Sequence, residues 1–426
     1  MHKNILVYPC GTEISFEIFN SLSSEKTITL FGANSVPGHA DFLYKNIFTN
    51  APFSGDEKLI DFLNDLISKN SIDFIYPAHD DALTYLSENR HRLKCAVLSC
   101  DTETVKISRS KVLTYKKLNK AKYLPFYSTN FTDFSSYPFF AKPCIGQGSF
   151  GTQKIESQSG LAKLNNFIDY VFCEYLPGEE FTIDCFTGLN NKLLFCNCRT
   201  RERIRNGISV RSKIVPITKE IKAIAYDINK KLKFYGAWFF QVKLDKNNHP
   251  KLMEVAPRIA GTMCVTRALG VNLPLLTVFL FCGLNIKILP NKYPVIADKC
   301  FSAKYNLSLD FEYIYLDFDD TLIINNNVNA FLLMFLYQCL NLNKKIILIT
   351  KHQSNIIDDL NKFKISHNIF FKIITLKKDD EKYKFIKEKK SIFIDDSFSE
   401  RKRVMEMCNI NCFGLENIDA LIDWRK

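Results

Sequence analysis

The chain has 426 residues, of which 46% are hydrophobic and 24% charged, which is ordinary for a soluble globular protein of two or three domains. Its formal net charge of +12 raises nucleic-acid binding as an interpretation, but no block of basic residues interleaved with aromatic residues supports that partner. The 14 cysteines include no C-x-x-C pair, which indicates reduced thiols and a cytoplasmic location.

The first residues, MHKNILVYPCG, contain one apolar strand and no signal-peptide core. The longest apolar runs, residues 273–284 and 331–340, are shorter than the roughly 18–20 residues that span a bilayer. These runs therefore predict buried helices, and no membrane partner is expected.

Residues 1–105 alternate short apolar strands with helical stretches. The predicted strands contain NILVY, TITLFG and IDFIYP, and the predicted helices contain SFEIFNSL and DEKLIDFLNDLISKN. This order predicts an α/β domain with a parallel, Rossmann-like sheet and crossover helices.

Residues 106–290 are rich in predicted strands and contain the pattern G-x-G-x-x-G at Gly146, Gly148 and Gly151. A dinucleotide-binding turn would open a helix at this point. Instead, the alternation in residues 152–156 predicts a strand. The glycines therefore predict the tip of a hairpin, whose backbone N–H groups could hold phosphate beside Lys142. A plain structural hairpin is the alternative.

Charged side chains follow on further predicted strands. Glu174 and Glu180, on two strands in residues 172–186, could bind a nucleotide or could simply be solvated. In RTRERIR, residues 199–205, a two-residue period places four arginines on one strand face, where an anion would relieve their repulsion or solvent would surround them. Two strands in residues 238–256 carry Gln241 and Glu254, and Arg258 follows them.

These segments resemble the ATP-grasp superfamily, in its carbamoyl-phosphate-synthetase-like branch, over residues 1–290. The resemblance implies a Rossmann-like leading domain followed by two lobes that hold ATP and Mg²⁺ (or Mn²⁺). The residues that it assigns to ATP are Lys111, Lys142, Gly146, Gly148, Ser149, Gly151, Glu174, Tyr175, Leu176 and Glu180. Gln241 and Glu254 would be metal ligands, and Arg258 would lie near the transferring phosphate.

One residue departs from the family pattern. The family usually has E-x-N-P-R where this chain has EVAPR, so Ala256 replaces an asparagine that would bind metal. Either another oxygen fills that place or the second metal binds weakly.

The family's chemistry implies that a small-molecule carboxylate is phosphorylated and that an amine attacks the resulting acyl phosphate. The substrates could be phosphorylated or linked to a nucleotide sugar. The residues predicted to hold the acyl phosphate or the acidic substrate are Arg199, Arg201, Arg203 and Arg205.

The end of the chain has a second set of chemical residues at the ends of predicted strands. Asp317 and Asp319 follow the strand YIYL, Thr350 ends KIILIT and Asp395 follows SIFI. Paired carboxylates at the carboxyl end of an open α/β sheet indicate a divalent cation such as Mg²⁺. The basic stretch 377–390 predicts a polar helix.

Residues 309–426 resemble the haloacid-dehalogenase superfamily of phosphohydrolases. The resemblance implies that Asp317 is the nucleophile and Asp319 the acid/base, and that both join Asp395 in the metal site. Thr350 and a lysine would hold the phosphate; Lys382 fits the spacing best, with Lys384 a close second. The short intervening segments leave no room for a sizeable cap domain.

The sequence thus predicts a leading domain at 1–105, an ATP-grasp domain at 106–290, a linker at 291–308 and an uncapped phosphatase domain at 309–426. The predicted function is an ATP-dependent carboxylate–amine ligase fused to a phosphatase that acts on the product or on a pathway intermediate. A kinase that stops at phosphorylation, a phosphatase of unrelated purpose and a nucleic-acid-binding or repair protein are the alternatives.

Overall fold

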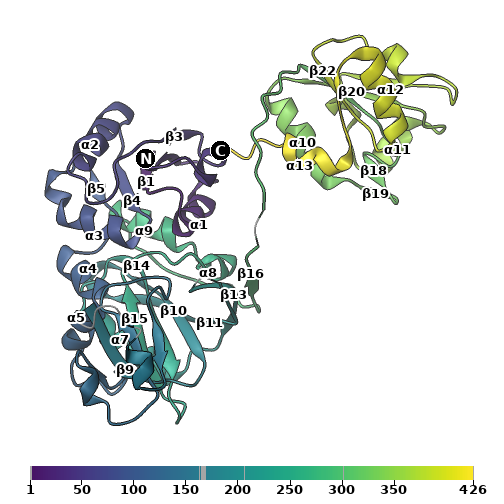
Figure 1. Ribbon diagram of the computed structural model, residues 1–426. Helices are drawn as coiled ribbons and strands as arrows, with labels where there is room; N and C mark the ends of the chain where they lie inside the picture. The colour runs from purple at the N-terminus through teal and green to yellow at the C-terminus, as the bar shows by residue number, and fades with distance from the viewer. Residues whose placement is uncertain (1, 163, 165–168, 206, 301, 426) are drawn as a thin grey trace. The chain divides into compact units, whose positions relative to one another are not determined.

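The computed structural model describes residues 2–425 except 163, 165–168, 206 and 301 (Figure 1). It divides into two compact units, one through residue 301 and the other from Ser302 to Arg425.

The first unit begins with the predicted parallel sheet, in the order β3-β2-β1-β4-β5. Its strands are β1 (Lys3–Tyr8), β2 (Ile28–Ala33), β3 (Asn46–Phe48), β4 (Phe74–Pro77) and β5 (Ala96–Val97). The helices are α1 (Glu13–Leu22), α2 (Leu59–Asn70) and α3 (Asp80–Glu88). Helix α1 begins after Thr12 because that side chain accepts the Ser15 N–H in a capping box.

Two further helices, α4 (Thr102–Arg109) and α5 (Lys111–Lys117), lead into a small antiparallel sheet in the order β6-β9-β7-β8. Its strands are β6 (Tyr127–Ser128), β7 (Phe139–Pro143), β8 (Gln153–Ile155) and β9 (Tyr170–Glu174), and α6 (Gln158–Leu161) follows β8. Strands β7 and β8 pair antiparallel, so the predicted glycine hairpin is confirmed.

A larger antiparallel sheet has the order β12-β13-β11-β10-β14-β15, with β16 beside β13. The strands are β10 (Glu180–Thr187), β11 (Leu193–Thr200), β12 (Arg203–Arg205), β13 (Ile208–Val215), β14 (Gly236–Leu244), β15 (Pro250–Ala256) and β16 (Ile296–Asp298). Helix α7 (Lys219–Lys231) covers one face, where its buried Ile221, Ile224 and Ile228 join the core of the sheet. The prediction of a linker at 291–308 is wrong at its start, because β16 belongs to this sheet.

The chain then returns to the leading domain through α8 (Cys264–Ala268) and α9 (Leu273–Phe281). Leu273 and Val278 of α9 share one hydrophobic core with Ile5 and Val7 of β1 and with Phe239 of β14. Helix α9 is apolar all round because it packs between the leading sheet and the large sheet. The two regions of the first unit are thereby joined by a continuous core.

The second unit has a parallel sheet in the order β21-β20-β17-β22-β23. Its strands are β17 (Tyr313–Leu316), β20 (Lys345–Thr350), β21 (Lys372–Thr375), β22 (Ser391–Ile394) and β23 (Asn411–Phe413). A small hairpin, β18 (Ile323–Ile324) and β19 (Asn327–Val328), follows β17. The helices are α10 (Ala330–Asn341), α11 (Ile356–Lys362), α12 (Phe398–Cys408) and α13 (Ile418–Leu421).

Within the described residues, the helices are all too short or too polar to cross a membrane. The polar helix predicted at 377–390 is wrong: only the short 3-10 turn Lys382–Phe385 forms there.

Candidate functional sites

A cleft in the first unit lies between the small sheet and strands β10, β14 and β15 of the large sheet. Its wall includes Lys111, Lys142, residues 146–150, Glu180, Arg201, Gln241 and Glu254. Residues up to 143 positions apart in the sequence, from Lys111 to Glu254, therefore meet at one cavity. Most of the residues named above are ones that the sequence predicts to hold ATP or metal.

Lys142 is the second-to-last residue of β7, just before the glycine loop, and is 4% exposed. Its Nζ donates hydrogen bonds to the Tyr115 hydroxyl at 2.7 Å and to the Met253 carbonyl at 3.2 Å. Lys111 begins α5, and burial lowers the pKa of its amine, with Lys142 and Arg109 adding to that effect. Two ammonium groups in one cleft indicate an anionic occupant.

The glycine loop joins β7 to β8 through residues with left-handed backbone. Gly148, Ser149 and Gly151 have φ values of 59°, 56° and 73°. The loop also contacts helix α4, because Arg109 donates to the Gly146 carbonyl at 3.2 Å. It contacts the leading domain through Gln147, whose Nε2 lies 2.8 Å from His79 Nε2. Since a strand follows the loop, it is not the opening of a dinucleotide-binding helix.

A second hollow continues from the first and shares Phe140, Lys142, Lys243 and Met253 with it. Its other lining residues are Pro125, Cys173, Glu174, Tyr175 and Leu176. The Glu174 carboxylate accepts the Phe126 N–H at 2.9 Å, so this side chain holds the neighbouring strand. A slot with a mostly apolar lining suits a flat aromatic ring.

Gln241 and Glu254 are register partners on β14 and β15 and both line the cleft. Side chains paired across antiparallel strands lie on one face, so an amide oxygen and a carboxylate are offered side by side. Mg²⁺ commonly takes one or two carboxylates together with phosphate oxygens, and this donor set fits such an ion. Ala256 is paired with Phe239, two residue pairs further along the strands and therefore on the same face.

Arg258 is held by a carboxylate that the sequence analysis did not identify. Its Nε and Nη2 donate to the two oxygens of Asp80, both at 2.7 Å, and its guanidinium lies 5.3 Å from the Phe239 ring centre. Burial opposes ionisation of Asp80, but Arg258 outweighs it and lowers the pKa of that carboxyl. Asp80 is the first residue of α3, after the strand β4, where parallel sheets place ligand-binding residues.

The prediction that four arginines share one strand face is wrong. Strand β11 ends at Thr200, and residues 201–202 lie outside any strand. Arg199 is buried, and its Nε and Nη2 donate to the two oxygens of Asp184 at 3.0 and 3.1 Å. This buried carboxylate neutralises the guanidinium. Arg203 pairs with Asp298, and Arg205 is exposed on β12.

Arg201 is the one of these four arginines that borders the cleft. Its Nε lies 2.9 Å from a Glu180 oxygen, and its Nη2 donates to the Gly207 carbonyl at 3.0 Å. Glu180, predicted to bind ATP, and Arg201, predicted to bind the substrate, are thus ion-paired with each other.

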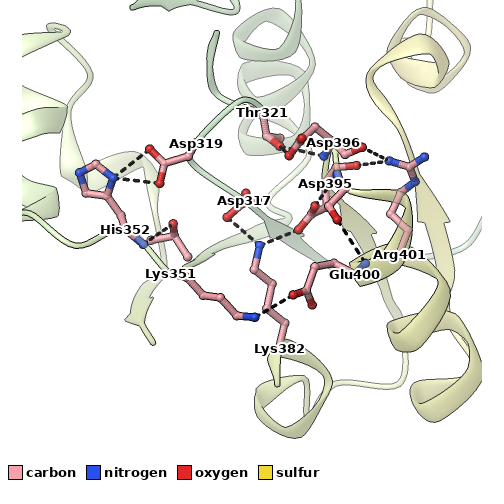
Figure 2. Close-up of polar contacts among 12 residues, drawn as sticks. Asp317, Asp319, Thr321, Lys351, His352, Lys382, Asp395, Asp396, Glu400 and Arg401 are labelled. Atoms are coloured by element: carbon pink, nitrogen blue, oxygen red, sulfur yellow. Dashed lines mark hydrogen bonds and ion pairs between the residues drawn. The ribbon is translucent and has the colours of Figure 1, made fainter. Parts of the chain in front are cut away.

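The second unit gathers its polar residues at the carboxyl ends of β17, β20 and β22. Lys382 Nζ lies 2.8 Å from Asp317 Oδ1 and 2.6 Å from Asp395 Oδ2, as Figure 2 shows. Burial raises the pKa of Asp317 to about 6 although Lys382 opposes this, and burial also raises the pKa of Asp395. Lys382 is buried and Lys384 exposed, so the structure favours Lys382 as the lysine of this site.

Asp317, Asp395 and Asp396 have oxygens within 4.8 Å of one another, a spacing that can hold a divalent cation. Asp319, which the sequence predicts as a metal ligand, is not in this group of described residues. Figure 2 shows its carboxylate turned to His352, on the other side of Asp317 from Asp395. Asp396 directly follows Asp395 in the sequence, and this adjacency is the signal that could have identified it as a metal ligand.

Two threonines brace this site. Thr321 Oγ1 accepts the Asp396 N–H at 3.0 Å, and the buried Thr350 Oγ1 accepts the His352 N–H at 3.1 Å. Burial opposes protonation of His352, but its hydrogen bonds to Asp359 and Asp319 outweigh it and raise the pKa of the imidazole. Nothing in the sequence pattern pointed to His352 or Asp359.

Residues 166–300 match the family model described as "ATP-grasp in the biosynthetic pathway with Ter operon". No curated protein matches the sequence.

Solved structures also resemble the chain. The biotin carboxylase domain of Hydrogenobacter thermophilus 2-oxoglutarate carboxylase, in complex with MgADP, ADP and bicarbonate, has 13% identity and a TM-score of 0.56, covering 70% of this chain and 74% of that one. N5-carboxyaminoimidazole synthetase from Staphylococcus aureus, complexed with ADP, has 18% identity and a TM-score of 0.54 over 69% and 81%. The L-amino acid ligase from Bacillus licheniformis has 18% identity and a TM-score of 0.51 over 65% and 73%. The chain therefore contains an ATP-grasp domain.

Proposed function

We propose that the first unit binds ATP with Mg²⁺ (or Mn²⁺) and uses it to join a small-molecule carboxylate to an amine. The observation that carries this proposal is the single cleft lined by Lys111, Lys142, the glycine loop and the opposed pair Gln241 and Glu254. The ADP complexes of two structurally similar proteins support the same assignment. Within this unit we assign residues 1–105 to the leading domain and 106–290 to the ATP-grasp domain.

Each part of the cleft has a proposed role in binding the nucleotide. The slot beside Tyr175 and Leu176 binds adenine. Glu174 holds the start of the edge strand β6 beside this slot by accepting the Phe126 N–H. When ATP binds, the Glu180 carboxylate leaves Arg201 and accepts hydrogen bonds from the ribose hydroxyls. Arg201 can then bind the acidic substrate. Lys111, Lys142 and the loop residues Gly146–Gly151 hold the phosphates.

The chemistry is phosphoryl transfer to a carboxylate oxygen, followed by attack of the amine on the acyl phosphate. When bound, Mg²⁺ held by Gln241 and Glu254 neutralises charge on the phosphates. Lys142, and Arg258 once it leaves Asp80, stabilise the charge that develops on the transferred group. The glycine loop, tied to His79 through Gln147, excludes water from the acyl phosphate.

For the second unit we propose an uncapped, Mg²⁺-dependent phosphatase of the haloacid-dehalogenase type, over residues 309–426. The supporting observation is that Asp317 and Asp395, at the carboxyl ends of the neighbouring strands β17 and β22, both contact the Lys382 amine. Asp317 is the proposed nucleophile and Asp319 the acid/base, while Thr350 and Lys382 hold the phosphate. Its substrate is the ligation product or a pathway intermediate.

The acyl phosphate provides the direct test of the ligase. The protein is incubated with Mg²⁺, ATP, hydroxylamine and pools of carboxylic acids, and hydroxamates are identified by mass spectrometry. A hydroxamate that forms together with ADP supports the proposal and names the acid. ADP formation with a phosphorylated alcohol and no hydroxamate would show a kinase instead.

A further inference from the structure

His352 is clamped between two carboxylates in the second unit. Its Nδ1 lies 2.9 Å from both oxygens of Asp319, as Figure 2 shows. Its Nε2 lies 2.7 Å from Asp359 Oδ2. The Ser354 hydroxyl lies 2.6 Å from the same Nε2 and also contacts Asp359. Both ring nitrogens are therefore engaged.

The ring is fixed from other directions as well. Phe318, which is 1% exposed and lies between Asp317 and Asp319 in the chain, meets the ring edge-on with centroids 4.9 Å apart. The backbone N–H of His352 donates to Thr350 Oγ1, which the sequence predicts as a phosphate ligand. His352 thus contacts, through separate atoms, the carboxylate of Asp319, which follows β17, and the hydroxyl of Thr350, which ends β20.

Asp319 depends on this residue for its orientation. Its side chain is 53% exposed, whereas that of His352 is 17% exposed. An exposed carboxylate with few restraints samples several rotamers, and a symmetric contact to both of its oxygens selects one. The carboxylate of Asp359, on α11, fixes the far side of the ring.

We propose that His352, held by Asp359 and Ser354, is a positioning residue that orients Asp319 to protonate the leaving group. This inference rests on the phosphatase function proposed above and adds a residue to it. In that reaction, an Asp317 oxygen attacks phosphorus and the bond from phosphorus to the ester oxygen breaks. The electron pair passes to the ester oxygen, which takes the proton of the Asp319 carboxyl as the alcohol leaves. Asp319 then accepts a proton from the water that cleaves the aspartyl phosphate.

The test exploits the fact that a poor leaving group needs the proton more than a good one. The full-length protein with Mg²⁺ is assayed on p-nitrophenyl phosphate and on phenyl phosphate, which have similar shapes but different leaving groups. For His352→Ala we expect kcat/KM on phenyl phosphate to fall by about 10- to 100-fold, and on p-nitrophenyl phosphate by less than about 3-fold. His352→Asn, which keeps an amide near the position of Nδ1, should recover part of the loss.

The controls separate positioning from folding and from the underlying function. Asp359→Asn, which does not touch Asp319, should give the same selective loss in weaker form, and thermal unfolding shows whether each variant folds. Equal losses on both esters, or no loss on either, would overturn the role of His352 while the wild type still hydrolyses them. If the wild type hydrolyses neither ester, the phosphatase proposal itself falls, and this inference falls with it.

Discussion

Lys142 is held in place by the protein itself. The Tyr115 hydroxyl and the Met253 carbonyl accept two of its three hydrogen-bond donors, and both come from elements that lie far from β7 in the sequence. A preorganised ammonium group loses little side-chain freedom when a phosphate binds, so most of its interaction energy is available for the ligand.

Replacing Lys142 by alanine should weaken ATP binding by about 10- to 100-fold, because a hydrogen bond from a charged donor contributes about 1.5–3 kcal/mol. Calorimetry with ATP and Mg²⁺ measures the effect, and thermal unfolding checks the fold. Lys192→Ala, at an exposed turn outside the cleft, is the matched control. An unchanged affinity in Lys142→Ala would remove this lysine from the nucleotide site.

Ala256 offers a second prediction at this scale. It lies two residues after Glu254 on β15, and its side chain therefore projects from the same face. Ala256→Asn adds an amide oxygen beside Glu254 and should lower the Mg²⁺ concentration that gives half-maximal ADP formation. A titration of ADP release against Mg²⁺ decides the matter, and an unaltered curve would show that residue 256 does not face the metal.

At the scale of elements, the glycine loop meets a second hairpin. A Cβ built on Gly207, between β12 and β13, would lie 1.9 Å from the Gly148 carbonyl oxygen. Gly207 also has φ of 74°, so both the backbone and the space demand glycine. The two hairpins pack against each other at one side of the cleft, where they can shield an acyl phosphate from water.

Gly207→Ala should separate the two hairpins and expose the intermediate to hydrolysis. We expect more phosphate released per hydroxamate formed than in the wild type. Gly283→Ala is the matched control, since Gly283 has φ of 79° but no atom within 4 Å of the added Cβ. Equal ratios in the wild type and Gly207→Ala would show that the contact between the hairpins does not protect the intermediate.

The sequence predicts elements best where one periodicity dominates. The strands β1, β2 and β4 and the helices α1, α2 and α9 lie where their apolar patterns place them. Residues 199–205 also have a strand period, yet the strand breaks because Arg199 is drawn into the interior by Asp184 and Arg203 pairs with Asp298. Those partners lie at a distance in the chain, and no local pattern reveals them.

The same limit applies to the sites. The motif residues Lys142, Gln241 and Glu254 meet at one cleft, whereas the partners of Arg258 and Asp319 were not predicted. Asp80 and His352 act through pairings that span 178 and 33 residues. Periodicity and spacing carry no information about such contacts.

At the scale of the whole molecule, the two sets of residues that we propose to handle phosphate lie in separate compact units. Each set is complete within its own unit: Lys142, Gln241 and Glu254 in one, and Asp317, Lys382 and Asp395 in the other. If each unit works through its own residues, a substitution in one should leave the chemistry of the other intact.

A crossed comparison of two variants tests this central claim most directly. ATP affinity and hydrolysis of p-nitrophenyl phosphate are both measured, with Mg²⁺, in the wild type, Lys142→Ala and Asp317→Asn. Asp317→Asn should lose phosphatase activity to background, because an amide cannot form the aspartyl phosphate, and should bind ATP as the wild type does. Lys142→Ala should bind ATP more weakly and should hydrolyse p-nitrophenyl phosphate as the wild type does. A variant that loses both ATP binding and phosphatase activity would contradict the account of two independent phosphate sites. Phosphatase activity that survives in Asp317→Asn would contradict it as well.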